Sequence, residues 1–205
     1  PASSAKWIDV FCDAGAFSPE QTRAILLAGQ AAGMLPRIHA NQLSRTTAVA
    51  LAIELGAASA DHLSTSSDAD IEALAASTTV ATLLPGAEFS TQHEGKLGRR
   101  FLDAHAQVAI ATDCNPGSSF TTSMPFCIAA AVSLLGFTVE EAVHAATAGG
   151  SAALRRSDIG TLAIGSRADI AILKSPSYIH LAYRPGADLV ETTLKAGRKV
   201  KTWQK

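Results

Sequence analysis

The sequence carries little charge and no surplus of either sign. Of its 205 residues, 17 are basic and 18 are acidic, which leaves a formal net charge of −1. The basic residues are scattered, apart from Arg99-Arg100, Arg155-Arg156 and the tail at 195–205. Because nucleic-acid binding requires a basic patch that meets the phosphates, we expect no nucleic-acid partner.

The chain also lacks a cysteine framework and a long hydrophobic run. Its three cysteines, Cys12, Cys114 and Cys127, show no Cys-x-x-Cys spacing, which favours the reducing cytoplasm. The alanine-rich stretch at 127–135 is too short to span a bilayer, so we expect no membrane partner. The sequence starts at Pro1 without an initiator Met, and we expect an internal segment of a longer protein.

Short apolar strands alternate with helical patterns through most of the sequence. Hydrophobic residues make up 47% of the chain, which is typical of an α/β protein with buried parallel strands. Strands are predicted at 7–12, 37–40, 58–63, 79–84 and 108–111. Helices are predicted at 18–32, 46–55, 68–77, 98–105, 124–135 and 138–148. The fold class is therefore α/β, with about five strand–helix units and parallel strands.

The pattern changes near Asp158. From Gly160 onward, short strands and turns follow one another with almost no helix, and the last strands are expected at 189–194 and 199–203. We expect residues 1–157 to form a partial barrel and residues 158–205 a small β appendage.

Three ionisable side chains stand where predicted strands end. His39 and His62 close the second and third strands, and Asp113 follows the strand at 108–111. The spacing of 23 residues between His39 and His62 fits one strand–helix unit of a barrel, so both would face the same rim. Two imidazoles and a carboxylate suit a divalent ion such as zinc or iron, which activates water. The alternative is that all three have structural roles.

The remaining histidines and several acids are interpreted as structural or solvated residues. A single histidine is more often a core or surface residue than a ligand, and Asp is common as a helix cap. This interpretation covers His93, His105, His144, His180, Asp61, Asp103 and Asp158.

Several longer motifs resemble one known family. They are Asp9-Val-Phe-Cys-Asp-Ala-Gly-Ala-Phe, Ile38-His-Ala-Asn-Gln-Leu-Ser, Ser59-Ala-Asp-His-Leu, Leu83-Leu-Pro-Gly, Ala111-Thr-Asp-Cys-Asn-Pro-Gly-Ser and Leu181-Ala-Tyr-Arg-Pro-Gly. Over essentially its whole length the chain is similar to the C-terminal half of metal-dependent amidohydrolases, and among them to the imidazolonepropionase family. This resemblance implies the C-terminal part of a TIM-type (β/α)8 barrel, with residues 158–205 contributing to a composite β-sandwich domain.

The resemblance implies a role for each matching residue. His39 matches a metal ligand, and Asp113 matches the last metal ligand, which also accepts a proton from the attacking water. His62 matches the catalytic histidine that contacts the substrate and stabilises charge on its carbonyl oxygen. The substrate-binding positions are matched by Gln42, His62, Asn115, Gly117 and Ser118, and the backbone amides of that last loop would be available to a carboxylate.

Two departures from the family pattern are visible. The usual His-Ala-Asp-Gln motif is His39-Ala40-Asn41-Gln42 here, from which we expect a modest effect. The sequence also has no His-x-His pair, which in the family supplies two further metal ligands from the first barrel strand. We therefore expect this chain to be inactive alone and to bind metal weakly, if at all. It would act as a homodimer or with the missing N-terminal half.

The reaction implied by the resemblance is the hydrolytic opening of the imidazolone ring of 4-imidazolone-5-propanoate to N-formimidoyl-L-glutamate, in histidine degradation. A divalent ion, zinc or iron, would be the cofactor and a small molecule the substrate. The alternatives are another cyclic-amide hydrolase, a nucleobase deaminase acting on guanine or cytosine, and a non-catalytic fragment.

Overall fold

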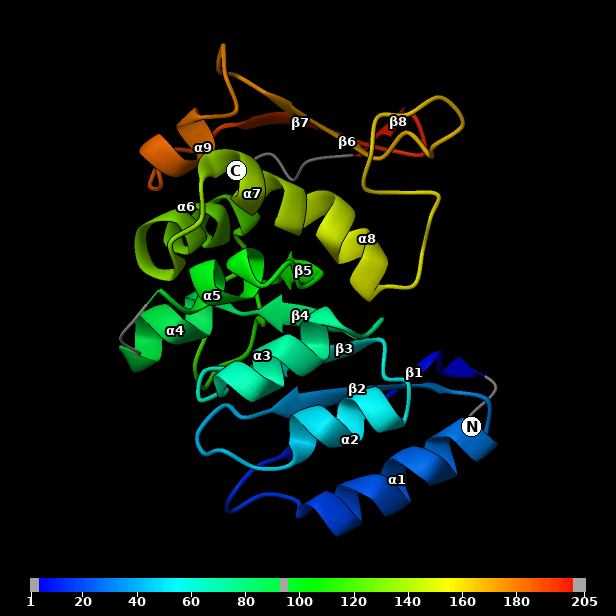
Figure 1. Cartoon of the computed structure of the whole chain (residues 1–205). Coiled ribbons are helices and arrows are strands. Elements are labelled where there is room, and N and C mark those ends of the chain that lie inside the picture. Colours follow the sequence, from blue (N-terminus) through cyan, green and yellow to red (C-terminus); the bar gives the residue numbers. More distant parts are fainter. Residues whose placement is uncertain (1–3, 93–95, 201–205) are drawn as a thin grey trace.

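A five-stranded parallel sheet forms the larger part of the chain. The computed structural model describes residues 4–92 and 96–200, and orders the strands β1-β2-β3-β4-β5 as in the sequence. The strands are β1 (Trp7–Cys12), β2 (Leu35–Ala40), β3 (Ser59–His62), β4 (Val80–Leu83) and β5 (Val108–Ile110). All four pairings are parallel, which confirms the predicted sheet. Figure 1 shows the strands stacked one above the next.

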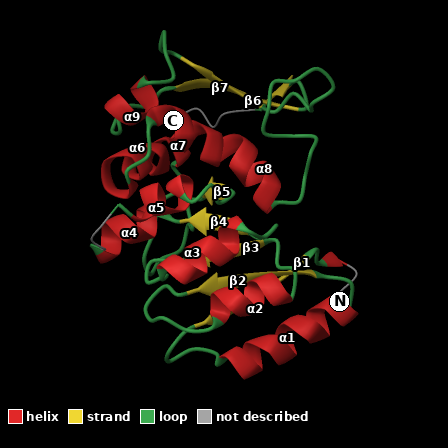
Figure 2. Cartoon of the chain, viewed as in Figure 1, coloured by secondary structure: helices red, strands yellow, loops and turns green. Residues whose placement is uncertain are grey.

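Helices follow the strands along the chain. They are α1 (Pro19–Ala31), α2 (Ala48–Glu54), α3 (Asp68–Ala75), α4 (Pro85–Thr91), α5 (Leu97–Asp103) and α6 (Met124–Leu135). Ser18 and Gln21 form a capping box at the start of α1, which confirms the predicted helix start. The helices α1, α2 and α3 lie together on one face of the sheet (Figure 2).

Two helical regions differ from the prediction. The helix α4 was not among the predicted helices; Pro85 occupies its first turn, a position where proline favours a helix. The predicted helix at 138–148 is divided into α7 (Val139–His144), the π-helix η2 (Ala145–Gly149) and α8 (Gly150–Ala153). At Gly149 a Cβ would collide with the carbonyl oxygen of Val108, so glycine lets this helix approach β5.

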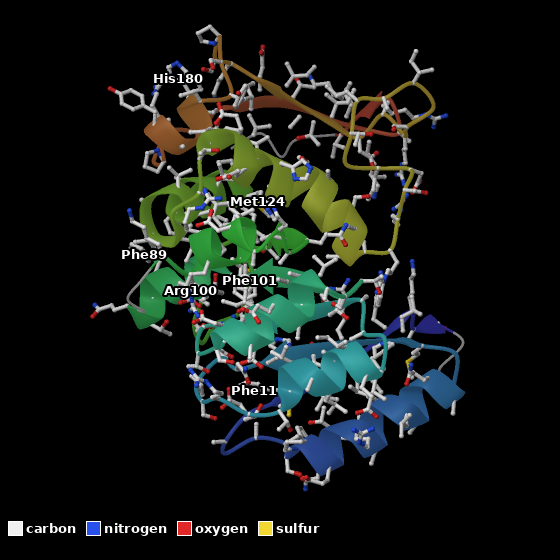
Figure 3. The ribbon with its side chains drawn as sticks, viewed as in Figure 1. Phe11, Phe89, Arg100, Phe101, Met124 and His180 are labelled. Atoms are coloured by element: carbon white, nitrogen blue, oxygen red, sulfur yellow. The ribbon has the colours of Figure 1, made fainter. Side chains whose placement is uncertain are left out.

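The strands β3, β4 and β5 are buried on both faces, as expected of strands in a barrel, whereas buried residues of β1 and β2 alternate with partly exposed ones. The main core lies between the sheet and the helices, and its fully buried side chains include Leu26, Ile38, Leu74, Leu83 and Phe101. Phe101 lies in the middle of the molecule in Figure 3. A second cluster of Val80, Ala109 and Ala153 is separate from this core. Among the described residues, β1 and β5 each pair on one side only.

A small antiparallel sheet follows the helices. Its strands are β6 (Ile170–Leu173), β7 (Val190–Lys195) and β8 (Arg198–Lys199), and the single-turn helix α9 (His180–Tyr183) packs on α6. Figure 1 shows this sheet at the opposite end of the molecule from β1 and α1. The expected β appendage is thereby confirmed. The domain boundary at 157 stays a prediction, and residues 201–205 of the last expected strand lie outside the described residues.

Candidate metal and catalytic site

The three strand-end candidates meet at one place. His39 lies at the end of β2, His62 ends β3, and Asp113 follows β5. Each offers one ligand atom, and these atoms all lie within 4.8 Å of one another. Two imidazole nitrogens and a carboxylate oxygen are the donors that zinc and iron accept in proteins, so the donor set fits a divalent ion.

His39 is held by residues of the neighbouring strand β1. Its Nδ1 lies 3.0 Å from Asp9 Oδ1 and 2.9 Å from Asp9 Oδ2, and the ring of Phe11 meets it edge-on at 5.9 Å between centroids. Burial lowers the pKa of His39, but the hydrogen bond and charge of Asp9, aided by Asp61 and Asp113, outweigh it and raise the pKa above its ordinary value. His39 therefore sits in an acidic surrounding.

His62 lies in a different surrounding on the next strand. It is 2% exposed, and its Nδ1 has no hydrogen-bond partner among the described residues. Its Nε2 lies 3.8 Å from Asp113 Oδ2, and its ring centroid is 5.1 Å from that of His39. Burial, with a smaller contribution from the nearby charge of His39, lowers the pKa of His62 to about 3. This side chain is a neutral imidazole at ordinary pH.

The left-handed backbone at the end of β3 turns His62 into the site. His62 has φ +74° and Leu63 φ +66°, a conformation that residues other than glycine adopt rarely. The neighbouring loop supports it, because the backbone N–H of Leu63 donates to the Ala40 carbonyl at 3.0 Å and that of Thr65 donates to the Asn41 carbonyl at 2.9 Å. Backbone strain of this kind is often found at functional sites.

Asp113 is also left-handed, with φ +48°, and its carboxylate accepts a hydrogen bond from Asn115 Nδ2 at 3.0 Å. Burial and the negative charge of Asp9 raise the pKa of Asp113, although His39 and the Asn115 hydrogen bond pull it the other way. The carboxylate is thereby a better proton acceptor than an exposed aspartate.

The loop after Asp113 is tied together by the side chain of Asn115. Its Oδ1 accepts the backbone N–H groups of Gly117 and Ser118, both at 2.8 Å. The expectation that these two amides are available to a substrate carboxylate is therefore wrong for this structure, since the loop satisfies its own donors. The open amides were implied by the family resemblance, and a matching motif does not show which acceptor these amides meet.

Gln42 lies in a bend after β2 and lines a cavity of about 210 Å³ together with His62. The same cavity is lined by Glu88 of α4, which sequence reasoning missed because no helix was predicted at 85–91. Glu88 is buried, and the Ser64 hydroxyl donates to its carboxylate. A buried acid in an unexpected helix therefore faces the predicted catalytic histidine across one cavity.

Among the other acids and histidines, Asp61 differs from its interpretation, whereas Asp103 and Asp158 are exposed as expected. Asp61, interpreted as a cap or solvated charge, is instead buried on β3 with Oδ1 unpartnered among the described residues, and burial raises its pKa. His105 and His144 are exposed, and His180 lies at the opposite end of the molecule from Phe11, the neighbour of His39 (Figure 3). His93 lies outside the described residues.

Comparison with known proteins agrees with this geometry. The model of the amidohydrolase family matches residues 7–203. The chain belongs to the amidohydrolase family. Among curated amidohydrolases, it is 61% identical over 200 residues to the imidazolonepropionase of Streptomyces avermitilis, which covers 98% of this chain and 48% of that protein. The imidazolonepropionase of Mycolicibacterium smegmatis is 61% identical over 203 residues, covering 99% of this chain and 51% of that protein.

Solved amidohydrolase structures share the fold at low sequence identity. The A. niger ochratoxinase has a TM-score of 0.76 at 21% identity, and the match covers 96% of this chain and 51% of that one. An adenosine deaminase from Xanthomonas campestris with bound zinc has a TM-score of 0.72 at 18% identity, covering 95% and 51%. The chain spans about half the length of the curated relatives it matches.

Within residues 4–92 and 96–200, the structure contains no helix with the length and hydropathy needed to cross a bilayer.

Proposed function

We propose that this chain carries the C-terminal half of the active site of an imidazolonepropionase, which opens the imidazolone ring of 4-imidazolone-5-propanoate to N-formimidoyl-L-glutamate. The observation that carries the proposal is the meeting of His39, His62 and Asp113 within 4.8 Å at the strand ends. The proposed substrate is inferred from the curated relatives, which are imidazolonepropionases at 61% identity. The likeness to guanine deaminase of E. coli, at 17% identity, concerns the fold alone.

His39 and Asp113 would hold one divalent ion, zinc or iron. When bound, such an ion supplies an activated water and polarises the carbonyl of the ring. Both side chains offer their ligand atoms on the same side of the sheet, together with His62.

Asp113 transfers the proton in this proposal, and His62 stabilises the developing negative charge. Asp113 accepts the proton of the attacking water as the water oxygen bonds to the ring carbonyl carbon, and returns it to the ring nitrogen as the C–N bond breaks. His62, kept neutral by burial, donates its ring N–H to the oxygen on which negative charge develops. Gln42, which lines the cavity beside His62, would bind the rest of the substrate. The loop of Asn115, Gly117 and Ser118 would contact it through groups other than the Gly117 and Ser118 amides, which Asn115 occupies.

A complementary chain segment would complete the site. Parallel strands in a closed barrel pair on both sides, whereas β1 and β5 pair on one side only among the described residues. We propose that the matching N-terminal half covers these two edges, and that residues 158–205 complete a β-sandwich with it. A homodimer of the completed protein, in the cytoplasm, is a further part of this proposal.

A chimera tests the proposed activity. The half of the Streptomyces avermitilis relative that precedes the matched region is joined to this chain, loaded with zinc, and incubated with 4-imidazolone-5-propanoate. We expect N-formimidoyl-L-glutamate by mass spectrometry, no product from guanine or cytosine, and no product from the 205-residue chain alone. Failure of the chimera to open the ring under conditions where the intact relative does so would contradict the proposal.

A further inference from the structure

We propose that Asp9 is a positioning residue, which fixes the ring of His39 and holds its proton on Nδ1 so that Nε2 is the nitrogen presented to the metal ion. This inference rests on the proposed role of His39 as a metal ligand. It concerns a residue of β1 that neither the spacing of the strand-end histidines nor the matching substrate loop singles out.

The contact is direct and occupies one ring nitrogen. Both carboxylate oxygens of Asp9 lie within hydrogen-bond distance of His39 Nδ1, at 3.0 and 2.9 Å. An ionised carboxylate only accepts hydrogen bonds, so Nδ1 must carry the proton. In a neutral imidazole the lone pair is then on Nε2, which is the only ring nitrogen left to bind a metal.

Asp9 contacts His39 rather than Arg37, its register partner on β2. In the parallel register, Asp9 is opposite Arg37, and His39 is opposite Phe11. Arg37 is occupied elsewhere, since its guanidinium donates to Ser59 Oγ at 3.1 Å and to the Ala153 carbonyl at 2.5 Å, and stacks over Trp7 at 4.3 Å.

Asp9 and Phe11 together hold the imidazole plane. They are two residues apart on one strand and so point to the same face of the sheet. Phe11 meets the imidazole ring edge-on while Asp9 holds its Nδ1. A carboxylate behind a metal-ligating histidine usually fixes both its tautomer and its orientation, and its loss typically lowers metal affinity by about 10- to 100-fold.

The tautomer of His39 tests this directly and needs no metal. The metal-free 205-residue chain, labelled with ¹⁵N, is measured by long-range ¹H–¹⁵N correlation at a pH where the ring is neutral. We expect the proton on Nδ1 in the wild type, loss of that preference in Asp9→Ala, and its return in Asp9→Asn, whose amide oxygen still accepts. Asp68→Asn, which removes an exposed carboxylate paired with Arg100, is the matched control and should change nothing.

Adding excess zinc to the ¹⁵N-labelled chimera, as wild type and as Asp9→Ala, separates this inference from the proposed function, because the chimera carries both halves of the site. We expect zinc to shift the Nε2 resonance of His39 in the wild type, with an affinity about 10- to 100-fold lower in Asp9→Ala. A wild-type ring that carries its proton on Nε2, or one that is indifferent to Asp9→Ala, overturns the role of Asp9. If the tautomer is as expected but zinc leaves His39 unshifted, the metal assignment fails instead.

Discussion

His39 and His62 end neighbouring strands of one sheet, yet their surroundings make them different chemical groups. His39 is backed by a carboxylate and its pKa is raised, whereas His62 is buried without a partner on Nδ1 and its pKa is lowered to about 3. The two ring centroids are only 5.1 Å apart. The difference indicates that one rim of a sheet can supply a cation ligand and a neutral hydrogen-bond donor from the same residue type.

The largest expected effect is on turnover, and the zinc content of the variants distinguishes the two histidines. In the chimera, His39→Ala and His62→Ala should each lower turnover by about 100-fold or more, because each removes a group that acts at the reacting atoms. Only His39→Ala should also lose zinc, measured by plasma emission spectrometry. His105→Ala, an exposed histidine at the end of α5, is the control and should keep both. A His62→Ala protein that loses its zinc while His39→Ala retains it would reverse the assignment.

The next effect is on acid stability. Burial lowers the pKa of His62 from 6.5 to about 3, so below pH 6.5 the unfolded chain binds a proton that the folded chain does not. Its contribution to stability is therefore complete above pH 6.5 and is lost as the pH falls toward 3. His39, with a raised pKa, works in the opposite direction, because its contribution is present at low pH and is lost as the pH rises.

The measurement for this prediction is the free energy of unfolding in urea at about pH 7.5 and pH 5. When the pH falls from about 7.5 to 5, the free energy of unfolding of the wild type should drop by about 2 kcal/mol more than that of His62→Gln. His105→Gln, at an exposed histidine, is the matched control. If the free energy of unfolding changed equally with pH in the wild type and in His62→Gln, His62 would not be held neutral by burial.

A smaller effect concerns Asn41, which joins the loops that follow the two histidine strands. Its side-chain oxygen accepts from the backbone N–H of Thr46 at 2.9 Å and from Thr46 Oγ1 at 3.1 Å, while its backbone carbonyl accepts from Thr65. Asn41→Ala leaves the partly buried donors of Thr46 without their acceptor and should cost about 1 kcal/mol in urea unfolding. Asn41→Asp keeps an acceptor oxygen and should cost less. If Asn41→Asp lost more free energy of unfolding than Asn41→Ala, the introduced charge and not the lost acceptor would determine the effect.

Sequence reasoning predicted the strand ends well because they depend on local signals. The apolar run that ends at Ile110 and the turn residues after it place Asp113 at a rim, and parallel pairing then brings it beside His39. The capping box of Ser18 and Gln21 likewise fixes the start of α1 from four residues. These features need no knowledge of the partner strands.

What the sequence missed depends on which groups meet across strands. Asp9 was part of a family motif without a stated role, because its contact with His39 follows from the β1–β2 register. Asp61 was interpreted as solvated, although β3 is buried on both faces. The amides of Gly117 and Ser118 are taken by Asn115, and no sequence pattern shows that choice of acceptor.

The central claim is that His39 and Asp113 share one ion beside a neutral His62. It is tested most directly by anomalous diffraction at the zinc absorption edge, from crystals of the zinc-loaded chimera. We predict one anomalous peak, marking a zinc ion that lies about 2.0–2.2 Å from both His39 Nε2 and a carboxylate oxygen of Asp113. A peak bonded to His39 Nδ1, or zinc bound only away from these two side chains, would contradict the account.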